Sequence, residues 1–260
     1  MKLERRIRMT GKLQFDTAFH VGSGREGELG TDSGVLRDPA GLPMLPGSSI
    51  KGKYRATVEK IAPTIGLTAC LLDSALSSTM CVSDADYLKK TRSQFRLLPN
   101  QQKKLEWLAG NTCDVCKLFG SQLQASRIFF SDGRLDSWVG ALQVRDGVCI
   151  DRDSETARKE LKYDFEVVPA GATFHITMEM ENPSAHDTAL FAAGLSEWQC
   201  GVRLGGFTSR GLGLARLEIG AIEQVDFSDS KQRNAYLLGR TWQEMNTEDL
   251  MVPLRALMGA

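Results

Sequence analysis

The chain has 260 residues, which is long for one ordinary domain and short for two, so we expect one core that carries large insertions. Hydrophobic residues make up 42% of the chain and charged residues 25%, as in typical globular proteins. No apolar run is long enough to span a membrane, and residues 1–10 lack the apolar core of a secretion signal. We therefore expect a cytoplasmic protein with no membrane partner.

The chain has equal numbers of basic and acidic residues, 32 of each, so its formal net charge is zero. This balance argues against a strongly basic, free-standing nucleic-acid binder, although phosphate binding depends on local charge. Two segments are locally basic, residues 51–60 and residues 89–104. A phosphate-binding surface and an ordinary solvated face explain the second segment equally well.

In the N-terminal part, alternating apolar residues predict a strand over residues 6–21, with a bulge or bend at Gly11. A polar loop with several glycines follows this strand. Ser48 and Ser49 are residue types typical of helix N-caps, and they predict a helix over residues 50–61.

The rest of the chain alternates between patterned and unpatterned segments. Residues 64–110 indicate an insertion with a short helix near residues 101–108, and residues 144–169 indicate a protruding arm with a helix at 154–162. The other expected elements are a short strand over 127–131, a strand over 173–180, a helix over 187–200 and a last strand over 214–219. The order strand, helix, strand, strand, helix, strand is the ferredoxin-like βαββαβ arrangement of an α+β protein.

The strongest local signal is the CxxC pair Cys113 and Cys116. In a protein that is not secreted, such a pair indicates a metal site or a redox site, and the βαβ setting of a redox site is not evident here. Cys70 and Cys81 precede the pair, so a zinc site with four thiolate ligands is available. The alternative is a CxxC pair with two incidental cysteines upstream. The remaining cysteines are interpreted as buried apolar residues: Cys149 and Cys200.

Residues 201–213 form a glycine-rich loop, in which glycines let backbone amides come close to an anion. Arg203 and Arg210 add positive charge, and Phe207 is suited to stacking on a base. The loop lacks the GK[ST] sequence of a P-loop and the strand-to-helix context of a dinucleotide site. A tight hairpin before the last strand explains the same pattern.

Residues 46–55 place hydroxyl groups and backbone amides at a helix N-terminus, where phosphate groups bind readily. Lys51 and Arg55 lie four residues apart and share one face of this helix. Such a surface suits sequence-independent contacts with a sugar–phosphate chain. The candidate RNA-binding residues of this segment are Ser48, Ser49, Lys51, Lys53 and Arg55.

Two further polar residues lie near the loop that follows the first strand. Asp32 is flanked by glycines in a segment too polar to be core, so it is either a functional carboxylate or a solvated loop residue. His20 lies beside the same loop, and it is either an RNA contact or a structural histidine at a strand end.

Taken in order, these segments resemble the RAMP superfamily, specifically the backbone subunits of type III CRISPR–Cas effector complexes. The resemblance covers most of residues 11–220, and its specificity comes from the ordered set of stretches. These are Phe19–Gly22, Thr31–Ser33, Arg37–Pro39, Gly41–Pro43, Pro46–Gly52, Cys116–Gly120, Arg127–Asp132, Val148–Arg152, Glu166–Gly171 and the glycine-rich loop.

The resemblance implies an RRM-like palm with a zinc-binding finger insertion (residues 64–120) and a thumb hairpin (residues 144–169). In such complexes several copies stack head to tail along a guide RNA, together with other effector subunits, and the guide pairs with a single-stranded target RNA. The thumb displaces base pairs at regular intervals, and an aspartate cuts the target there. Asp32 occupies the place of that aspartate. The finger zinc ligands correspond to Cys70, Cys81, Cys113 and Cys116.

The chemistry of RNA limits what Asp32 has to do. The 2′-hydroxyl is an internal nucleophile, so most of the acceleration would come from in-line alignment. A free aspartate is a poor base at neutral pH, so we expect Asp32 to hold a divalent cation such as Mg²⁺ or to gain basicity by burial. A non-catalytic scaffold subunit shares every binding feature. A guide-processing nuclease of the same superfamily is the third hypothesis, against which the aspartate loop and the finger insertion argue.

Overall fold

The computed structural model describes residues 2–70 and 81–259, so part of the finger segment lies outside it. The described residues form an α+β fold with a seven-stranded antiparallel sheet and a separate two-stranded sheet. In the large sheet the strand order is β2-β6-β1-β8-β7, β3 also pairs with β6, and β9 also pairs with β8. Its strands are β1 (Arg5–Phe15), β2 (Ile128–Phe130), β3 (Arg134–Ser137), β6 (Thr173–Glu181), β7 (Val202–Arg203), β8 (Leu214–Asp226) and β9 (Gln243–Glu244).

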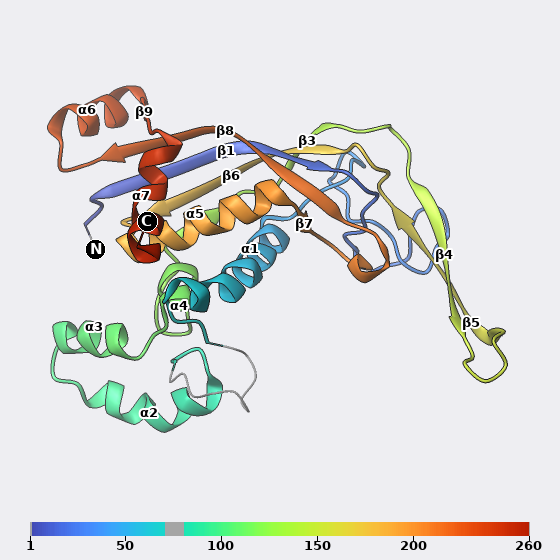
Figure 1. The fold of residues 1–260 in the computed structure, drawn as a ribbon, viewed down its shortest axis with the longest axis horizontal. Coiled ribbons are helices and arrows are strands. Elements are labelled where there is room, and N and C mark those ends of the chain that lie inside the picture. The colour runs from blue at the N-terminus through green and yellow to red at the C-terminus, as the bar shows by residue number, and fades with distance from the viewer. Residues whose placement is uncertain (1, 71–80, 260) are drawn as a thin grey trace.

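Helices α1 (Gly47–Ile61) and α5 (Ala185–Cys200) lie on the same side of the large sheet, as Figure 1 shows. Side chains that alternate along β6 face them, because successive residues of a strand point to opposite sides. The two helices meet at a close contact, where the Tyr54 hydroxyl donates to the carbonyl oxygen of Phe191 over 2.6 Å. A Cβ at Gly194 would lie 2.6 Å from that hydroxyl, so only glycine fits there.

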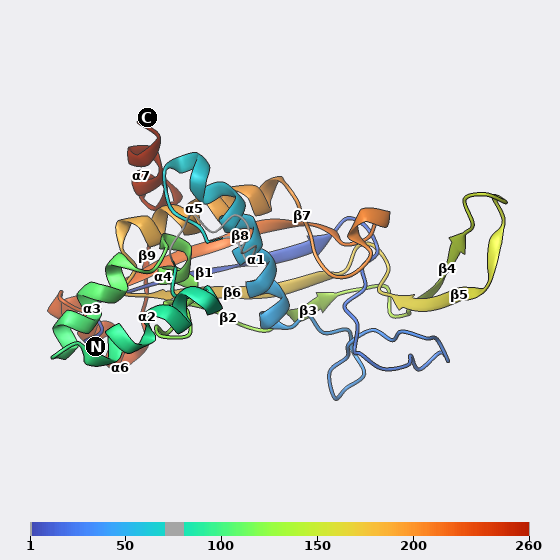
Figure 2. The same ribbon diagram turned by 90° about the horizontal axis from the view of Figure 1, so that it is seen from below.

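Two parts of the chain project from the sheet and its helices, as Figure 1 shows, and the second is also seen in Figure 2. The first contains α2 (Ala85–Leu97), α3 (Gln101–Gly110) and the short α4 (Asp114–Phe119). The second is the hairpin of β4 (Gln143–Ile150) and β5 (Ala157–Val167), whose strands pair with each other and not with the large sheet. None of the described helices is both long and apolar enough to cross a membrane.

Several expectations from the sequence are confirmed. The strand over 173–180 is β6, the helix over 187–200 is α5 and the helix near 101–108 is α3. The pairing of β1 with β8 shifts register between Thr10 and Gly11, as expected for a bulge. A Cβ on Gly11 would lie 2.5 Å from the carbonyl oxygen of Glu218, which explains why glycine occupies this position.

Other expectations are wrong. The segment 154–162 forms no helix, because residues from Ala157 onward pair with β4 and this pairing overrides local helix propensity. Ser48 and Ser49 do not cap α1, which begins at Gly47 after Pro46. Instead the Asp132 carboxylate accepts the backbone N–H of Gly47 over 2.7 Å.

The chain ends also differ from expectation. The first strand ends at Phe15, and the chain then leaves the sheet, with one isolated bridge between Phe19 and Val168. The last core strand continues to Asp226, and α6 (Ser230–Gly239), β9 and α7 (Thr247–Met258) follow it. Helix α7 packs against α5.

Candidate functional site

A cleft of about 520 Å³ lies between the first half of α1 and the glycine-rich loop. Segments separated by some 150 positions in the sequence meet there, and they bring glycine backbone and cationic side chains together. Its lining includes His20, Ser49, Gly52, Lys53, Arg203, Gly205, Gly206 and Thr208. A neighbouring cleft of about 280 Å³ shares Lys53, Arg203 and Thr208 and adds Lys60.

Positive charge gathers where the two clefts adjoin. Partial burial lowers the pKa of Lys53, and the nearby cations Lys60 and Arg203 lower it further. Like charges held this close favour an anionic ligand, because the ligand relieves their mutual repulsion. The arrangement suits a phosphate group or another multiply charged anion.

The expected basic residues of α1 do not form one surface. Lys51 and Arg55 line a different cleft, of about 730 Å³, together with Ser83 and Phe119. The Lys51 ammonium donates to the hydroxyl of Ser126 over 3.1 Å, and partial burial followed by the charge of Arg55 lowers its pKa. Helix α1 therefore presents two basic faces, one toward the glycine-rich loop and one toward α4.

Aromatic side chains pack the glycine-rich loop against β5. Phe207 has a left-handed backbone conformation, with φ of 56°, and its ring stacks on Phe165 at a centroid distance of 4.1 Å. The Arg210 guanidinium lies over the Phe207 ring and donates to the hydroxyl of Tyr163. Phe207, expected to stack on a base, thus stacks on protein, while Arg203 and Arg210 are exposed.

Asp32 lies in an exposed position in a loop, residues 25–37, that we call the Asp32 loop. Its backbone N–H donates to Asp164 Oδ1 over 2.8 Å, and its own Oδ2 accepts the backbone N–H of Asp164 over 3.0 Å. Both routes expected for Asp32 from the sequence, a divalent cation and basicity gained by burial, stay predictions.

Glu166 was not predicted as a functional residue, yet its side chain is hydrogen-bonded to the backbone of the Asp32 loop. Its side chain is 1% exposed, and its two carboxylate oxygens accept the backbone N–H groups of Leu29 and Val35, each over 3.0 Å. Leu29 and Val35 flank Asp32 on either side, so one buried carboxylate holds both arms of the loop. The sequence placed this glutamate at the end of a polar arm and at the start of the stretch Glu166–Gly171, with no sign that it meets the loop.

His20 is buried, with 5% of its surface exposed, at the edge of the first cleft. Its Nδ1 lies 2.7 Å from the carbonyl oxygen of Glu166, so this nitrogen carries the proton and donates. Its Nε2 then accepts from the Ser33 hydroxyl over 3.3 Å. These contacts correspond to the structural alternative for His20, and they connect it to the residue that follows Asp32.

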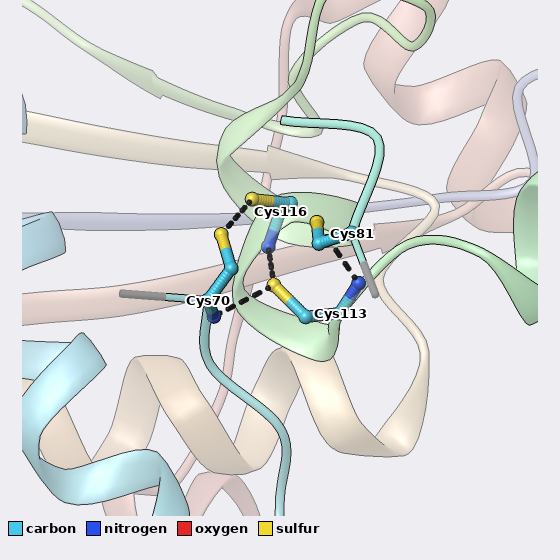
Figure 3. Close-up of side chains that lie close together, drawn as sticks. All are labelled: Cys70, Cys81, Cys113 and Cys116. Carbon is cyan, nitrogen blue, oxygen red and sulfur yellow. Dashed lines mark hydrogen bonds between the residues drawn. The ribbon is translucent and has the colours of Figure 1, made fainter. Parts of the chain in front are cut away.

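The four candidate metal ligands come together beside α1 (Figure 3). Cys70, Cys81, Cys113 and Cys116 are all buried, and their sulfur atoms lie within 4.8 Å of one another. In a tetrahedral zinc site with Zn–S bonds of about 2.3 Å, neighbouring sulfurs lie about 3.8 Å apart, so the described side chains fit this ion. The site draws ligands from three separate stretches of chain.

Polar groups surround these sulfurs and donate hydrogen bonds to them. The backbone N–H of Cys70 and that of Cys116 both point at the Cys113 sulfur, over 3.3 and 3.4 Å. The Ser83 hydroxyl donates to the Cys116 sulfur over 3.0 Å. Mutual hydrogen bonds among the four thiols lower the pKa values of Cys81 and Cys116, that of Cys116 to about 7, and raise those of Cys70 and Cys113. Cys149 and Cys200, expected to be buried, are exposed because β4 is solvated on both faces and Cys200 ends α5.

The chain is similar in sequence to known proteins. The sequence pattern of the RAMP superfamily matches residues 12–216. Three relatives are each described as a CRISPR system Cms endoribonuclease Csm3. The protein from Methanocaldococcus jannaschii is 25% identical over 228 residues, which cover 82% of this chain and 79% of the relative.

The other two alignments are shorter. The Enterococcus italicus protein is 47% identical over 58 residues, 21% of this chain and 27% of the relative. The Methanothermobacter thermautotrophicus protein is 39% identical over 62 residues, 23% of this chain and 25% of the relative. This chain thus aligns with about a quarter of the length of these two relatives. Because the family pattern spans most of the chain, the protein belongs to the RAMP superfamily.

Proposed function

We propose that this protein is a guide-RNA-binding backbone subunit of a type III CRISPR effector complex and that it cuts the paired target RNA. The observation that carries the proposal is the meeting of α1 with the glycine-rich loop, where Lys53, Lys60 and Arg203 converge beside glycine backbone. Such a surface grips phosphates without reading bases, which is what a subunit repeated along a guide of any sequence requires.

The fold supports the same assignment. The core strands run β8-β1-β6-β2 across the sheet, which is the spatial order of a ferredoxin-like or RRM-like βαββαβ palm. We regard the whole of 1–260 as one RAMP domain, with residues 64–120 as its finger and residues 144–169 as its thumb. The β4–β5 hairpin projects from the body, as a wedge into a guide–target duplex must.

Binding partners follow from this geometry. Contacts along a continuous sugar–phosphate chain repeat when further copies of the same subunit bind head to tail, and such a heterologous interface builds a filament. The partners would be the guide RNA, a single-stranded target RNA, other copies of this chain and other effector subunits. The place of action would be the cytoplasm, where both RNAs are found.

For target cleavage, the loop holds Asp32 in an exposed position at the root of the thumb. The 2′-hydroxyl of the displaced nucleotide loses its proton and attacks the adjacent 3′-phosphate, and the bond from phosphorus to the 5′-oxygen of the next nucleotide breaks. The products are a 2′,3′-cyclic phosphate and a 5′-hydroxyl, whose oxygen takes up a proton. Alignment by the thumb supplies most of the acceleration. Mg²⁺ is commonly held by one or two carboxylates together with substrate phosphates, and the Asp32 carboxylate is the protein ligand in this proposal. A bound Mg²⁺ would stabilise the charge that develops on the phosphate.

The cysteine site has a structural part in this proposal. Four thiolates close the coordination sphere of zinc, so the ion cannot take a substrate. Helices α2 and α3 each have one buried residue, Leu88 in α2 and Leu108 in α3. Metal binding would therefore provide much of the folding free energy of the finger.

The test is target cleavage by complexes purified with their co-expressed neighbours. The Asp32→Ala complex should retain its small guide RNA and lose cleavage at this subunit's positions. Glu26→Ala, an exposed acidic residue of the same loop, is the matched control and should cut normally. Purification of the subunit with no RNA in any assembly would refute guide binding, and unchanged cleavage by Asp32→Ala would refute catalysis.

One observation favours a non-catalytic scaffold as the second candidate. Both the N–H and the carboxylate of Asp32 are engaged with Asp164, a pattern that also serves a purely structural loop. In that case Asp32→Ala would destabilise the loop, and the wild-type complex would bind target without cutting it. The guide-processing alternative requires histidine-based chemistry, and His20, the histidine beside the Asp32 loop, is buried.

A further inference from the structure

A series of contacts holds the Asp32 loop against the C-terminal end of β5. Besides the two Asp32–Asp164 hydrogen bonds, the backbone N–H of Glu166 donates to the carbonyl oxygen of Ser33 over 3.0 Å. Ser33 and Phe165 form an isolated parallel bridge. Besides its backbone hydrogen bonds within residues 21–44, the loop is therefore joined to the thumb strand.

The side-chain hydrogen bond of Asp164 goes to the Asp32 loop and not to the other strand of the hairpin. The cross-strand neighbour of Asp164 in β4 is Asp146, whose carboxylate lies 3.5 Å from the Lys162 ammonium. The side chain of Asp164 bonds instead to the Asp32 loop, where its Oδ1 accepts the Asp32 N–H. The carboxylates of Asp32 and Asp164 thus each accept the backbone N–H of the other residue.

The reciprocal hydrogen bonds fix Asp32 in two ways. The contact to its N–H holds the backbone, and the contact to its Oδ2 fixes the rotation of its carboxylate. The position of Oδ1, the other carboxylate oxygen of Asp32, is then fixed as well. Preorganisation of this kind matters most for a group that acts through alignment, because a displacement of about 1 Å costs a rate factor of about 100.

We infer that Asp164 is a positioning residue for Asp32, which ties the orientation of the cleaving carboxylate to the thumb strand. This inference rests on the proposed function, because it assumes that Asp32 acts in cleavage. It assigns Asp164 no contact with RNA or metal: its side chain acts by accepting the Asp32 N–H. The thumb would then both distort the duplex and carry the group that acts on the distorted linkage.

The experiment measures single-turnover cleavage of a paired target by complexes containing Asp164→Ala, Asp164→Asn, Asp146→Ala or Asp32→Ala. Asp164→Ala should slow cleavage about 10- to 100-fold while guide content and target affinity stay unchanged. Asp164→Asn should restore most of the rate, because an amide oxygen still accepts the Asp32 N–H. Asp146→Ala, the cross-strand control, should cut at the wild-type rate.

Each other result overturns the inference. If Asp164→Ala cuts normally while Asp32→Ala does not, positioning by Asp164 is refuted and the proposed function stands. If Asp164→Asn is as slow as Asp164→Ala, the charge itself is required and Asp164 is more than a positioning residue. Loss of guide RNA from Asp164→Ala would show a role in assembly instead. If Asp32→Ala cuts normally, the catalytic proposal and this inference fail together.

Discussion

Arg55 donates a hydrogen bond from Nη2 to the sulfur of Cys116 over 3.2 Å. The same guanidinium pairs with Glu59 one turn further along α1, through Nε at 2.8 Å. Four thiolates around a divalent zinc ion carry net negative charge, and a partly buried guanidinium beside them reduces the cost of holding that charge. The helix that carries the proposed phosphate contacts is therefore joined to the proposed metal site.

The first prediction concerns metal content. The purified wild-type protein should contain about one zinc per chain, and Cys113→Ala should contain almost none, because Cys113 belongs to the four-sulfur cluster. Elemental analysis after extensive dialysis measures both. Cys149→Ala, at an exposed cysteine outside the cluster, should keep its zinc. A wild-type protein that is fully folded and free of metal would contradict the four-cysteine proposal.

The second prediction concerns Arg55. Arg55→Gln should weaken zinc binding about 10- to 100-fold, because residues that hydrogen-bond to metal ligands typically contribute this much. Competition with a chelator of known affinity gives the constant directly. Arg92→Gln, at an exposed arginine of α2 in the same finger, should bind zinc like the wild type. Equal zinc affinities for Arg55→Gln and wild type would show that the contact with Cys116 does not contribute to zinc binding.

Local patterns were enough for much of the fold. The alternation in β6 and the apolar face of α5 lie within single elements, and the glycine at the β1 bulge is a local requirement of one backbone contact. The CxxC pair also gave a local signal, and the two distant cysteines were found by counting ligands. The residues identified in this way can be recognised from their neighbours in the sequence or from the number of ligands that a metal ion requires.

The rest depends on pairings between distant segments. Asp164 and Glu166 meet the Asp32 loop from more than 130 positions away, and nothing beside them in the sequence indicates a loop partner. The cap of α1 is likewise distant, because it comes from Asp132. Helix propensity around Ser154 was misleading because pairing between β4 and β5 determines the conformation of that segment.

The third prediction concerns the guide. Lys53→Ala should weaken binding of guides of every sequence and reduce the slope of log affinity against log salt by about 0.7, as for one lost phosphate contact on a single strand. Titration at several salt concentrations gives the slope. Lys231→Ala, on α6 and far from the clefts, is the control for a loss of one surface charge. A loss confined to some guide sequences would contradict a phosphate contact.

The pH dependence of the same contact has a definite sign. Burial and neighbouring cations lower the pKa of Lys53 from 10.5 in the RNA-free protein, and a bound phosphate favours the charged form. Guide affinity should therefore fall as pH rises through that lowered pKa, below the pH at which an ordinary lysine titrates. Lys53→Arg should remove this decline, because arginine stays charged. A 2′-O-methyl guide avoids alkaline hydrolysis during the measurement.

The last prediction concerns the buried carboxylate under the Asp32 loop. Glu166→Gln keeps one acceptor oxygen and replaces the other with a donor that faces an N–H of Leu29 or Val35. Unfolding by urea should show a loss of about 1–3 kcal/mol, the cost of a buried group left without its partner. Glu26→Gln, exposed in the same loop, should change stability little. Cleavage by the Glu166→Gln complex should slow more than guide binding weakens, because the loop holds Asp32 while the guide-binding cations lie on α1 and β7. Equal stability of Glu166→Gln and wild type would mean that the loop does not depend on this carboxylate.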